Sequence, residues 1–272
     1  MVTTEFTGNP DDQFKHRLFT LRPESGRPEL EVLGVLGDDE SARIGKANED
    51  LYGVRFIGPR AYFVTFERTD PLYVVSLADA SSPTVLGELE VPGFSDLLHE
   101  VNSQLLLGLG SSERRFPKLE LYDVSELSNP QSLDCVELGV VRAAGVMATN
   151  GCDVSVDADW EWSFSPAQYN RYAFTYLVGN DTDRLTVPYS AGGTVDDRYL
   201  SVDRIALFEL TGKATPANAA LNLIGEIELT PGSVSGDTRV VIDSDALFVI
   251  ARSDLLSGLW DNAAAVTPFT EE

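Results

Sequence analysis

Lysine and histidine are scarce in this sequence, with only two histidines. The shortage of basic residues excludes some classes of binding partner. Lysine occurs only at positions 15, 46, 118 and 213, and Lys plus Arg total 20 against 43 Asp plus Glu, which gives a formal net charge of -23. A protein that tracks a phosphate backbone or an anionic membrane surface needs a basic face. We therefore expect no nucleic acid and no anionic membrane surface among the partners.

Long apolar runs and cysteines are also few. No apolar run approaches the roughly 20 residues that span a bilayer. The N-terminal sequence MVTTEFTGNPDDQFKH lacks the basic start and apolar stretch of a signal peptide, so the chain is either cytosolic or the mature part of something longer. The two cysteines, Cys135 and Cys152, form either a disulfide or two buried free thiols. No GxSxG, HExxH or phosphate-binding glycine loop occurs, so no enzyme class gains positive support.

Internal repeats are the most informative feature that is present. Hydrophobic residues make up 43% of the chain and aromatic residues 9%, enough for a folded core. The repeated unit is an apolar strand, a turn rich in Ser, Asn and Pro, and a second strand. Its copies are LFTLRPESGRPELEVLGVLG from Leu18, LYVVSLADASSPTVLGELEVPG from Leu72, LELYDVSELSNPQSLDCVELG from Leu119 and IALFELTGKATPANAALNLIGEIELTPG from Ile205. The first spacings fit propeller blades of roughly 40 to 50 residues.

Pairs of strands precede three of the repeats, and the pair for the first repeat lies at the far end of the chain. This order predicts an all-β fold, a single β-propeller of four blades whose closing blade combines strands from both termini. The expected blades are 51–93, 97–139 and 172–230, with a closing blade of 16–37 plus 239–252 and an insertion at 140–171. A β-sandwich or an open array of sheets is the alternative, because short strands between turns predict those as well. Helical turns are expected only at 166–169 and 254–260.

A family resemblance supports the propeller. Residues 51–110 contain VRFIGPRAY, TDPLYVVSL, VLGELEVPGFSDLLH and LLLGLG, and ELYDVSELSNP follows. This stretch resembles the uncharacterised, predicted secreted prokaryotic proteins with a C-terminal β-propeller domain. Members of that family are similar in carrying an N-terminal signal or lipid anchor and a longer propeller. The resemblance therefore implies a secreted, periplasmic or cell-surface location, and it implies no catalytic residue.

Acidic residues and one histidine are the candidates for chemistry. Asp157 and Asp159, in CDVSVDADWEW, are the preferred pair for a possible Ca²⁺ site, because Ca²⁺ takes six to eight oxygen ligands. The alternative is that these residues serve turns through local hydrogen bonds. His99 has a side chain suited to proton transfer, and a structural hydrogen bond to the nearby Asp96 or Glu100 is its alternative role.

The insertion at 140–171 is the expected place for function, because it concentrates aromatic residues beside acidic ones. Trp160, Trp162 and Tyr169 offer the large, rigid contact area common at protein and sugar interfaces; packing between blades is their alternative role. With His99 they are the candidate binding residues. The sequence thus predicts a non-enzymatic, exported binding or scaffolding module that contacts protein or glycan. The alternative is a metal-assisted hydrolase with acidic residues at the propeller channel. The oligomeric state stays open.

Overall fold

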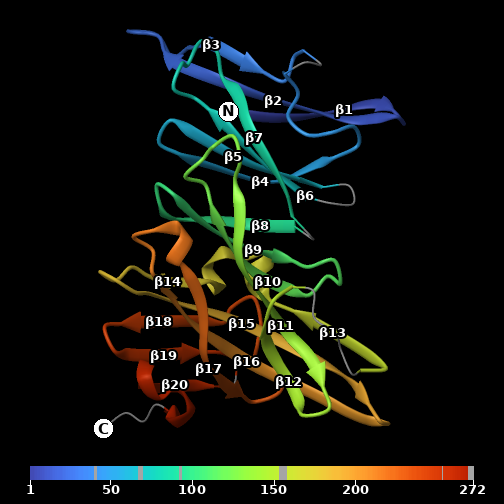
Figure 1. Cartoon of the computed structure of the whole chain (residues 1–272), viewed down its shortest axis with the longest axis vertical. Helices are drawn as coiled ribbons and strands as arrows, with labels where there is room; N and C mark the ends of the chain where they lie inside the picture. The colour runs from blue at the N-terminus through green and yellow to red at the C-terminus, as the bar shows by residue number, and fades with distance from the viewer. Residues whose placement is uncertain (40–41, 67–69, 92–93, 153–157, 253, 269–272) are drawn as a thin grey trace.

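The described residues form five β-sheets that follow one another in chain order along the long axis of the molecule (Figure 1). This computed structural model describes residues 1–39, 42–66, 70–91, 94–152, 158–252 and 254–268. Almost all strand pairs are antiparallel, and the helical segments in these ranges are short 3-10 turns. None of the helices described there is long and apolar enough for a membrane crossing. The prediction of an all-β chain is confirmed.

The first two sheets have the strand orders β1-β2-β3 and β4-β5-β6-β7. Their strands are β1 (Val2–Asn9), β2 (Asp12–Pro23), β3 (Leu30–Leu36), β4 (Asp50–Ile57), β5 (Arg60–Phe66), β6 (Asp70–Ser76) and β7 (Thr84–Val91). Ala61 and Phe63 of β5 pack towards the first sheet, and Tyr62 and Val64 pack towards the third. Because both faces of this strand are buried, its residues 61–64 are continuously apolar and do not alternate with polar ones.

The third sheet has the order β12-β11-β10-β9-β8 and contains the disulfide. Its strands are β8 (Phe94–Asn102), β9 (Leu105–Ser111), β10 (Pro117–Asp123), β11 (Gln131–Arg142) and β12 (Gly145–Asn150). A bond between Cys135 and Cys152 ties β11 to the segment that follows β12. The backbone N–H of Gly151 also donates to the carbonyl of Cys135, at 2.6 Å. The edge of this sheet is therefore fixed both covalently and by hydrogen bonding.

The fourth sheet is dominated by one long hairpin. It has the order β13-β15-β16-β17, and β14 also pairs with β15. Its elements are β13 (Trp160–Phe164), η2 (Pro166–Gln168), η3 (Arg171–Ala173), β14 (Thr175–Leu177), β15 (Asp183–Val195), β16 (Arg198–Thr211), η4 (Pro216–Asn218) and β17 (Ala220–Leu229). Asp196 and Asp197 connect β15 to β16, and both have positive φ, as the commonest two-residue hairpin turn requires.

The fifth sheet has the order β18-β19-β20-β21. Its elements are β18 (Arg239–Asp243), β19 (Ala246–Ile250), β20 (Leu255–Leu259), η5 (Trp260–Ala265) and β21 (Thr267–Pro268). Leu247 and Val249 face the fourth sheet and are fully buried, whereas Ile250, Leu255 and Leu259 are exposed. Sheet five thus has one buried apolar face and one apolar face that contacts solvent.

Four apolar layers hold the five sheets together, one between each successive pair. The largest lies between the third and fourth sheets and includes Leu107, Leu121 and Val187. Because burial of apolar area is the dominant favourable term in folding, these layers carry most of the stability. The core is therefore a series of sheet-on-sheet contacts rather than one central cluster.

A turn of one sheet packs on a glycine of the preceding sheet, and this contact recurs with the repeat. A Cβ at Gly34 would lie 2.6 Å from the carbonyl oxygen of Ala80, and a Cβ at Gly87 would lie 2.5 Å from that of Leu127. At the aligned position of the next repeat, the carboxylate of Asp134 accepts a hydrogen bond from the N–H of Leu221, at 2.9 Å. The repeat therefore encodes the spacing between sheets as well as the strands.

The expected closing blade does not form. The range 16–37 lies in the sheet β1-β2-β3 and the range 239–252 lies in the sheet β18-β19-β20-β21, at opposite ends of the molecule (Figure 1). The strands at each end of the chain pair instead with strands that are close to them in sequence. Residues 2–9, which were not expected to form a strand, pair with β2, and residues 255–259, where a helical turn was expected, pair with β19. The described residues consequently form five sheets, where four blades were predicted.

The range 140–171, expected as an insertion, contributes strands to both neighbouring sheets. Its residues 145–150 form β12, the edge of the third sheet, and its residues 160–164 form β13, the edge of the fourth. The expected helical turn at 166–169 corresponds to η2, where Pro166 stands at the first helical position and Ser165 caps the turn. The strands β12 and β13 are therefore integral parts of the third and fourth sheets.

Candidate functional site

Four aromatic side chains lie on one face of the fourth sheet, close to the turn between β15 and β16. Trp160, Trp162 and Phe164 alternate along β13, so they point to the same side. In register, Trp160 pairs with Thr194 of β15, which pairs with Tyr199 of β16. Directly opposed residues share a face, so Tyr199 joins the group. We call these four residues the aromatic face.

Strand β13 is held in place by its other side. The hydroxyl of Ser163 donates to the carbonyl of Leu138, at 2.9 Å, and Arg114 donates to the carboxylate of Glu161, at 2.7 Å. Both partners belong to the third sheet or its loops, so the odd-numbered residues of β13 point towards that sheet. The even-numbered aromatic residues must then point away from it.

A glycine beneath the aromatic face fixes the position of Trp162. A Cβ at Gly192 would lie 3.0 Å from the indole Nε1 and 3.2 Å from Cε2 of Trp162. The indole therefore rests against the backbone of β15, in space that a larger residue would fill. The rings of Trp162 and Phe164 are nearly parallel, with 19° between their planes and 6.0 Å between centroids. These two rings form a flat, fixed surface.

The aromatic face contacts solvent although the rest of the same sheet face is covered. Ile205 and Leu207, further along β16 on this side, are buried against the fifth sheet. Trp160 is 56% exposed and Tyr199 is 58% exposed, and Phe164 is 39% exposed. Fixed, exposed aromatic rings bind partners at low entropic cost and are enriched in binding hot spots. This part of the sheet is the best candidate for a binding surface.

The two other residues expected at a binding site lie elsewhere. Tyr169 is 70% exposed and caps η2. His99, in β8, packs against Tyr176 at 4.1 Å and Phe174 at 5.8 Å between ring centroids. Burial and the charge of Arg55 hold the pKa of His99 below its usual value, so its imidazole is neutral near pH 7. The packing of His99 between two rings supports neither proton transfer nor contact with the aromatic face.

Only one of the two residues preferred for Ca²⁺ lies in the described ranges. Asp157 lies outside the described residues, and Asp159 is exposed, with its backbone N–H donating to the carbonyl of Thr194. Two other acidic turns already have cations from the chain itself, since Asp183 pairs with Lys213 and Asp245 pairs with Arg184. Within the part of the chain that the structure describes, no group of three or more metal-ligating side chains is present.

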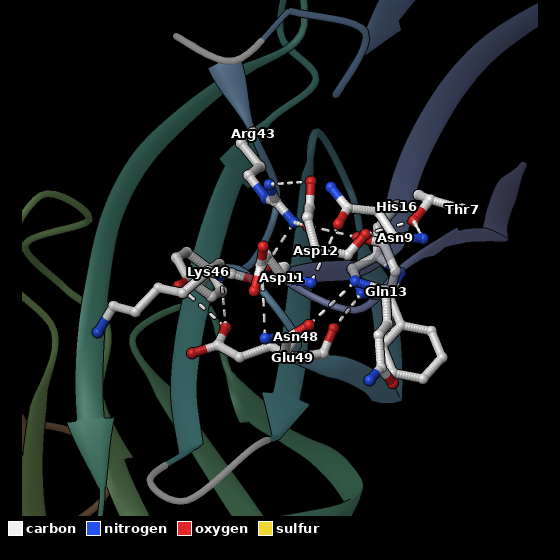
Figure 2. Close-up of polar contacts among 12 residues, drawn as sticks. Thr7, Asn9, Asp11, Asp12, Gln13, His16, Arg43, Lys46, Asn48 and Glu49 are labelled. Atoms are coloured by element: carbon white, nitrogen blue, oxygen red, sulfur yellow. Dashed lines mark hydrogen bonds and ion pairs between the residues drawn. The ribbon is translucent and has the colours of Figure 1, made fainter.

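A buried polar cluster between the first and second sheets was not found from the sequence (Figure 2). His16 donates from Nε2 to the carbonyl of Glu49, at 2.7 Å, so its Nδ1 can accept from the hydroxyl of Thr4, at 2.9 Å. The Glu49 carboxylate accepts from Thr65, at 2.6 Å, and from the backbone N–H of Lys46, at 2.7 Å. These groups satisfy one another, so the cluster stabilises the packing of the two sheets.

Residues around this cluster tie the loop before β4 to the β1–β2 turn, as Figure 2 shows. Arg43 donates to the carboxylate of Asp12, at 2.9 Å, and the side-chain carbonyl of Asn48 accepts from the N–H of Gln13, at 3.0 Å. The sequence signal for these contacts is weak, because the paired residues are about 30 positions apart. We assign this region a structural role.

A second buried polar cluster lies between the second and third sheets. Lys118 and Glu120 alternate on β10, so they share a face, and their exposed fractions are only 0% and 2%. The ammonium of Lys118 contacts the carboxylate of Glu120 at 2.6 Å, and the hydroxyls of Tyr122 and Ser132 donate to the same carboxylate at 3.0 and 2.6 Å. The charge of each partner is therefore compensated in the core.

Asp96 of β8 gives the fold a dependence on pH. Burial raises the pKa of Asp96 to about 6 from its usual 3.8. Because the folded-state pKa is the higher one, the contribution of Asp96 to stability is fully present below about pH 4 and is lost as pH rises through about 6. At pH 7 we expect Asp96→Asn to raise the free energy of unfolding by about 1–2 kcal/mol, less than full linkage gives, because the side chain keeps some contact with water.

Urea unfolding of both proteins at pH 5.0 and pH 7.5 tests this expectation. The gain in the free energy of unfolding from Asp96→Asn should be larger at pH 7.5 than at pH 5.0, because Asp96 is ionised in the folded wild type at pH 7.5. Asp181→Asn, at an exposed position, is the matched control and should show no such growth. An advantage that is equal at both values of pH would contradict the role given to Asp96.

Comparisons with known proteins agree with the sheet architecture. A family model described as a beta propeller domain matches residues 1–145, just over half of the chain and not its C-terminal part. An uncharacterised protein of Methanocaldococcus jannaschii is 42% identical over 112 residues, which is 41% of this chain and 17% of that protein. An uncharacterised protein of Archaeoglobus fulgidus is 35% identical over 132 residues, 48% of this chain and 21% of that protein. The chain thus spans about a fifth of the length of these relatives.

Two beta-propeller domains are among the solved structures that align with this chain. The beta-propeller domain of Nup133 from Vanderwaltozyma polyspora aligns with a TM-score of 0.38 and 11% identity, over 92% of this chain and 68% of that chain. The beta-propeller domain of the Trilobed protease from Pyrococcus furiosus aligns with a TM-score of 0.31 and 10% identity, over 100% of this chain and 79% of that chain.

Proposed function

The chain belongs to the beta propeller domain family, and from that premise we propose that it is a non-enzymatic binding module that holds a protein or glycan partner on its aromatic face. The observation that carries this proposal is the exposure of Trp160 and Tyr199 beside the fixed ring of Trp162. A propeller fold is suited to a scaffold, because rigid sheets hold side chains in place without moving parts.

The alternative function, a metal-assisted hydrolase, has no comparable support. Its chemistry needs carboxylates or histidines that converge on a metal and a substrate. His16 and His99 are both engaged in packing or hydrogen bonds. The buried carboxylates of Glu49, Glu120 and Asp183 accept hydrogen bonds from the chain's own donors. A binding role is therefore better supported by the described side chains than a metal-assisted hydrolase is.

We also propose that the five sheets are an arc of a larger ring that further blades complete. The outer face of the fifth sheet supports this, because Val241, Ile250, Leu255 and Leu259 are apolar and exposed there. A hollow of about 440 Å³ on the same sheet is lined by residues that include Phe248 and Leu259. A contiguous apolar sheet face of this kind fits a packed neighbour better than solvent.

An extracellular, periplasmic or cell-surface location is part of the same proposal. The disulfide between Cys135 and Cys152 supports it, because structural disulfides persist in oxidising compartments. A surface rich in acidic residues also keeps a protein soluble when it is exported.

Binding to the aromatic face can be tested directly. The wild-type chain is run in native gels that contain hydroxyethyl cellulose, laminarin or glycol chitin, and is also used to select a displayed library of random peptides. We expect at least one of these probes to bind, and Trp160→Ala and Tyr199→Ala each to weaken that binding by about tenfold or more, as hot-spot aromatic residues do.

Phe56→Ala is the matched control for this test, because Phe56 is an aromatic residue of similar exposure (48%) on a different sheet, in β4. It should leave binding unchanged. Binding that survives both aromatic-face substitutions, or that Phe56→Ala weakens equally, would rule out the aromatic face as the binding surface.

A further inference from the structure

A second exposed cluster consists of two tyrosines and two arginines. Its residues lie on different elements from those that carry the aromatic face. Tyr169 and Arg171 belong to the η2–η3 segment, as does Tyr172, and Arg239 begins β18 of the next sheet. Tyr169 is 70% exposed and Tyr172 is 65% exposed. We call these four residues the tyrosine–arginine patch.

Hydrogen bonds between the fourth and fifth sheets hold the patch together. The side chain of Asn170 donates to the carbonyl of Gly236, at 2.7 Å, and the hydroxyl of Thr175 donates to the carbonyl of Val240, at 2.7 Å. These contacts fix the η2–η3 segment against the start of β18 from both ends. The patch is therefore a built surface rather than a chance meeting of mobile side chains.

The two guanidinium groups approach the same tyrosine ring. The Cζ of Arg171 lies 5.2 Å from the ring centroid of Tyr172, and the Cζ of Arg239 lies 5.9 Å from it. Arg239 is oriented by donating from Nη1 to the carbonyls of Gly236 and Thr238, at 2.8 and 2.7 Å. Both of these hydrogen bonds use Nη1, and the Nε and Nη2 of Arg239 form no hydrogen bond in the described ranges.

The two arginines of the patch differ from several other arginines in the described ranges in having no salt bridge. Arg17, Arg114 and Arg204 each pair with carboxylates, as expected in a chain with 43 acidic and 20 basic residues. Across the described ranges, neither Arg171 nor Arg239 forms an ion pair with an acidic residue. The nearby positive charge also lowers the pKa of Tyr172 through its hydrogen bond with Arg171. Two arginines without a salt bridge in the described ranges therefore lie beside exposed tyrosines, with the exposed Asp237 as the neighbouring acidic residue in sequence.

We propose that the tyrosine–arginine patch binds an acidic segment of a polypeptide. Guanidinium groups bind carboxylates through paired hydrogen bonds, and exposed Tyr beside Arg is the composition of protein-interface hot spots. The net charge of -23 repels such a segment at long range, but at 0.15 M salt charges beyond about 8 Å are screened. The two arginines then determine binding at the patch.

Fluorescence anisotropy of the whole chain at 150 mM NaCl tests the proposal, with fluorescein-labelled hexaglutamate as the probe. We expect hexaglutamate to bind, and hexaglutamine to bind at least tenfold more weakly. Arg171→Gln and Arg239→Gln should each weaken hexaglutamate binding by about tenfold, the equivalent of one lost charge-assisted hydrogen bond. Arg171 is exposed, so its variant should fold normally even if Arg239→Gln disturbs the loop that it anchors.

Two controls give the test a clear outcome. Arg198→Gln, an exposed arginine at the start of β16, and Trp160→Ala, on the aromatic face, should both bind hexaglutamate like the wild type. Retained binding in Trp160→Ala separates this patch from the proposed function. The proposal is overturned if hexaglutamate does not bind, if Arg171→Gln binds it as well as the wild type, or if polygalacturonate competes at lower concentration than unlabelled hexaglutamate.

Discussion

Replacing Glu120 with leucine is expected to lower the free energy of unfolding by about 3–5 kcal/mol. The substitution leaves the ammonium of Lys118 in the core, where its exposed fraction is 0%, without the carboxylate that contacts it at 2.6 Å. It also removes the acceptor for the hydroxyls of Tyr122 and Ser132. Urea unfolding followed by tryptophan fluorescence measures the loss.

The double variant Lys118→Met with Glu120→Leu is the matched control. Replacing a whole buried ion pair with apolar residues of similar volume is often close to neutral, whereas removing one partner is costly. We therefore expect the double variant to regain most of the stability that Glu120→Leu loses. A single variant within 1 kcal/mol of the wild type, or a double variant no more stable than the single one, would show that the pair is not buried as described.

Gly87→Val is expected to destabilise the fold by about 3 kcal/mol or more, because the added atoms overlap the backbone of the next sheet. A Cβ at this position would lie 2.5 Å from the carbonyl oxygen of Leu127 and 2.8 Å from the carbonyl carbon of Ser128. Backbone atoms cannot move aside as a flexible side chain can. The second and third sheets must therefore separate to admit the new side chain.

Gly225→Val offers the corresponding change without the overlap. Gly225 lies in β17 beside a strand irregularity, as Gly87 does in β7, but nothing lies within 4 Å of a Cβ built there. We expect the free energy of unfolding of this variant to lie within about 0.5 kcal/mol of that of the wild type. Thermal and urea unfolding of the two variants should differ clearly, and equal stability would contradict the close packing of Gly87 against the following turn.

The interior strands of this fold are readable from sequence because their signal is local. Within the run RAYFVTF, residues 61–64 are all apolar, as expected for a strand buried on both faces, and Gly58 with Pro59 marks the turn before it. The terminal strands are harder, because which strand pairs with which depends on distant parts of the chain. In the structure β2 pairs with residues 2–9, and β19 pairs with residues 255–259. Nothing in the sequence of either segment indicates that β2 and β19 form these local pairs and do not belong to one shared sheet.

The candidate binding residues divide in the same way. Trp160 and Trp162 are visible in the sequence because they lie close together, but Tyr199 joins them only through the pairing of β13 with β15 and of β15 with β16. The Asp196–Asp197 turn of that hairpin was not predicted from the sequence, and both residues have positive φ in the structure. Similarly, Arg239 meets Tyr172 only because the fourth and fifth sheets pack together.

The first and fifth sheets are unlike each other and lie at opposite ends of the molecule (Figure 1). A contact between the outer face of β18–β20 in one copy and the first sheet of another would therefore join two different surfaces. Such a heterologous contact has no two-fold axis, so it does not end at a dimer. Each added copy would present the same free face again. The assembly would close into a ring only if the rotations between successive copies add up to a full turn. Separate copies of this chain would then grow end to end, with a length set by concentration.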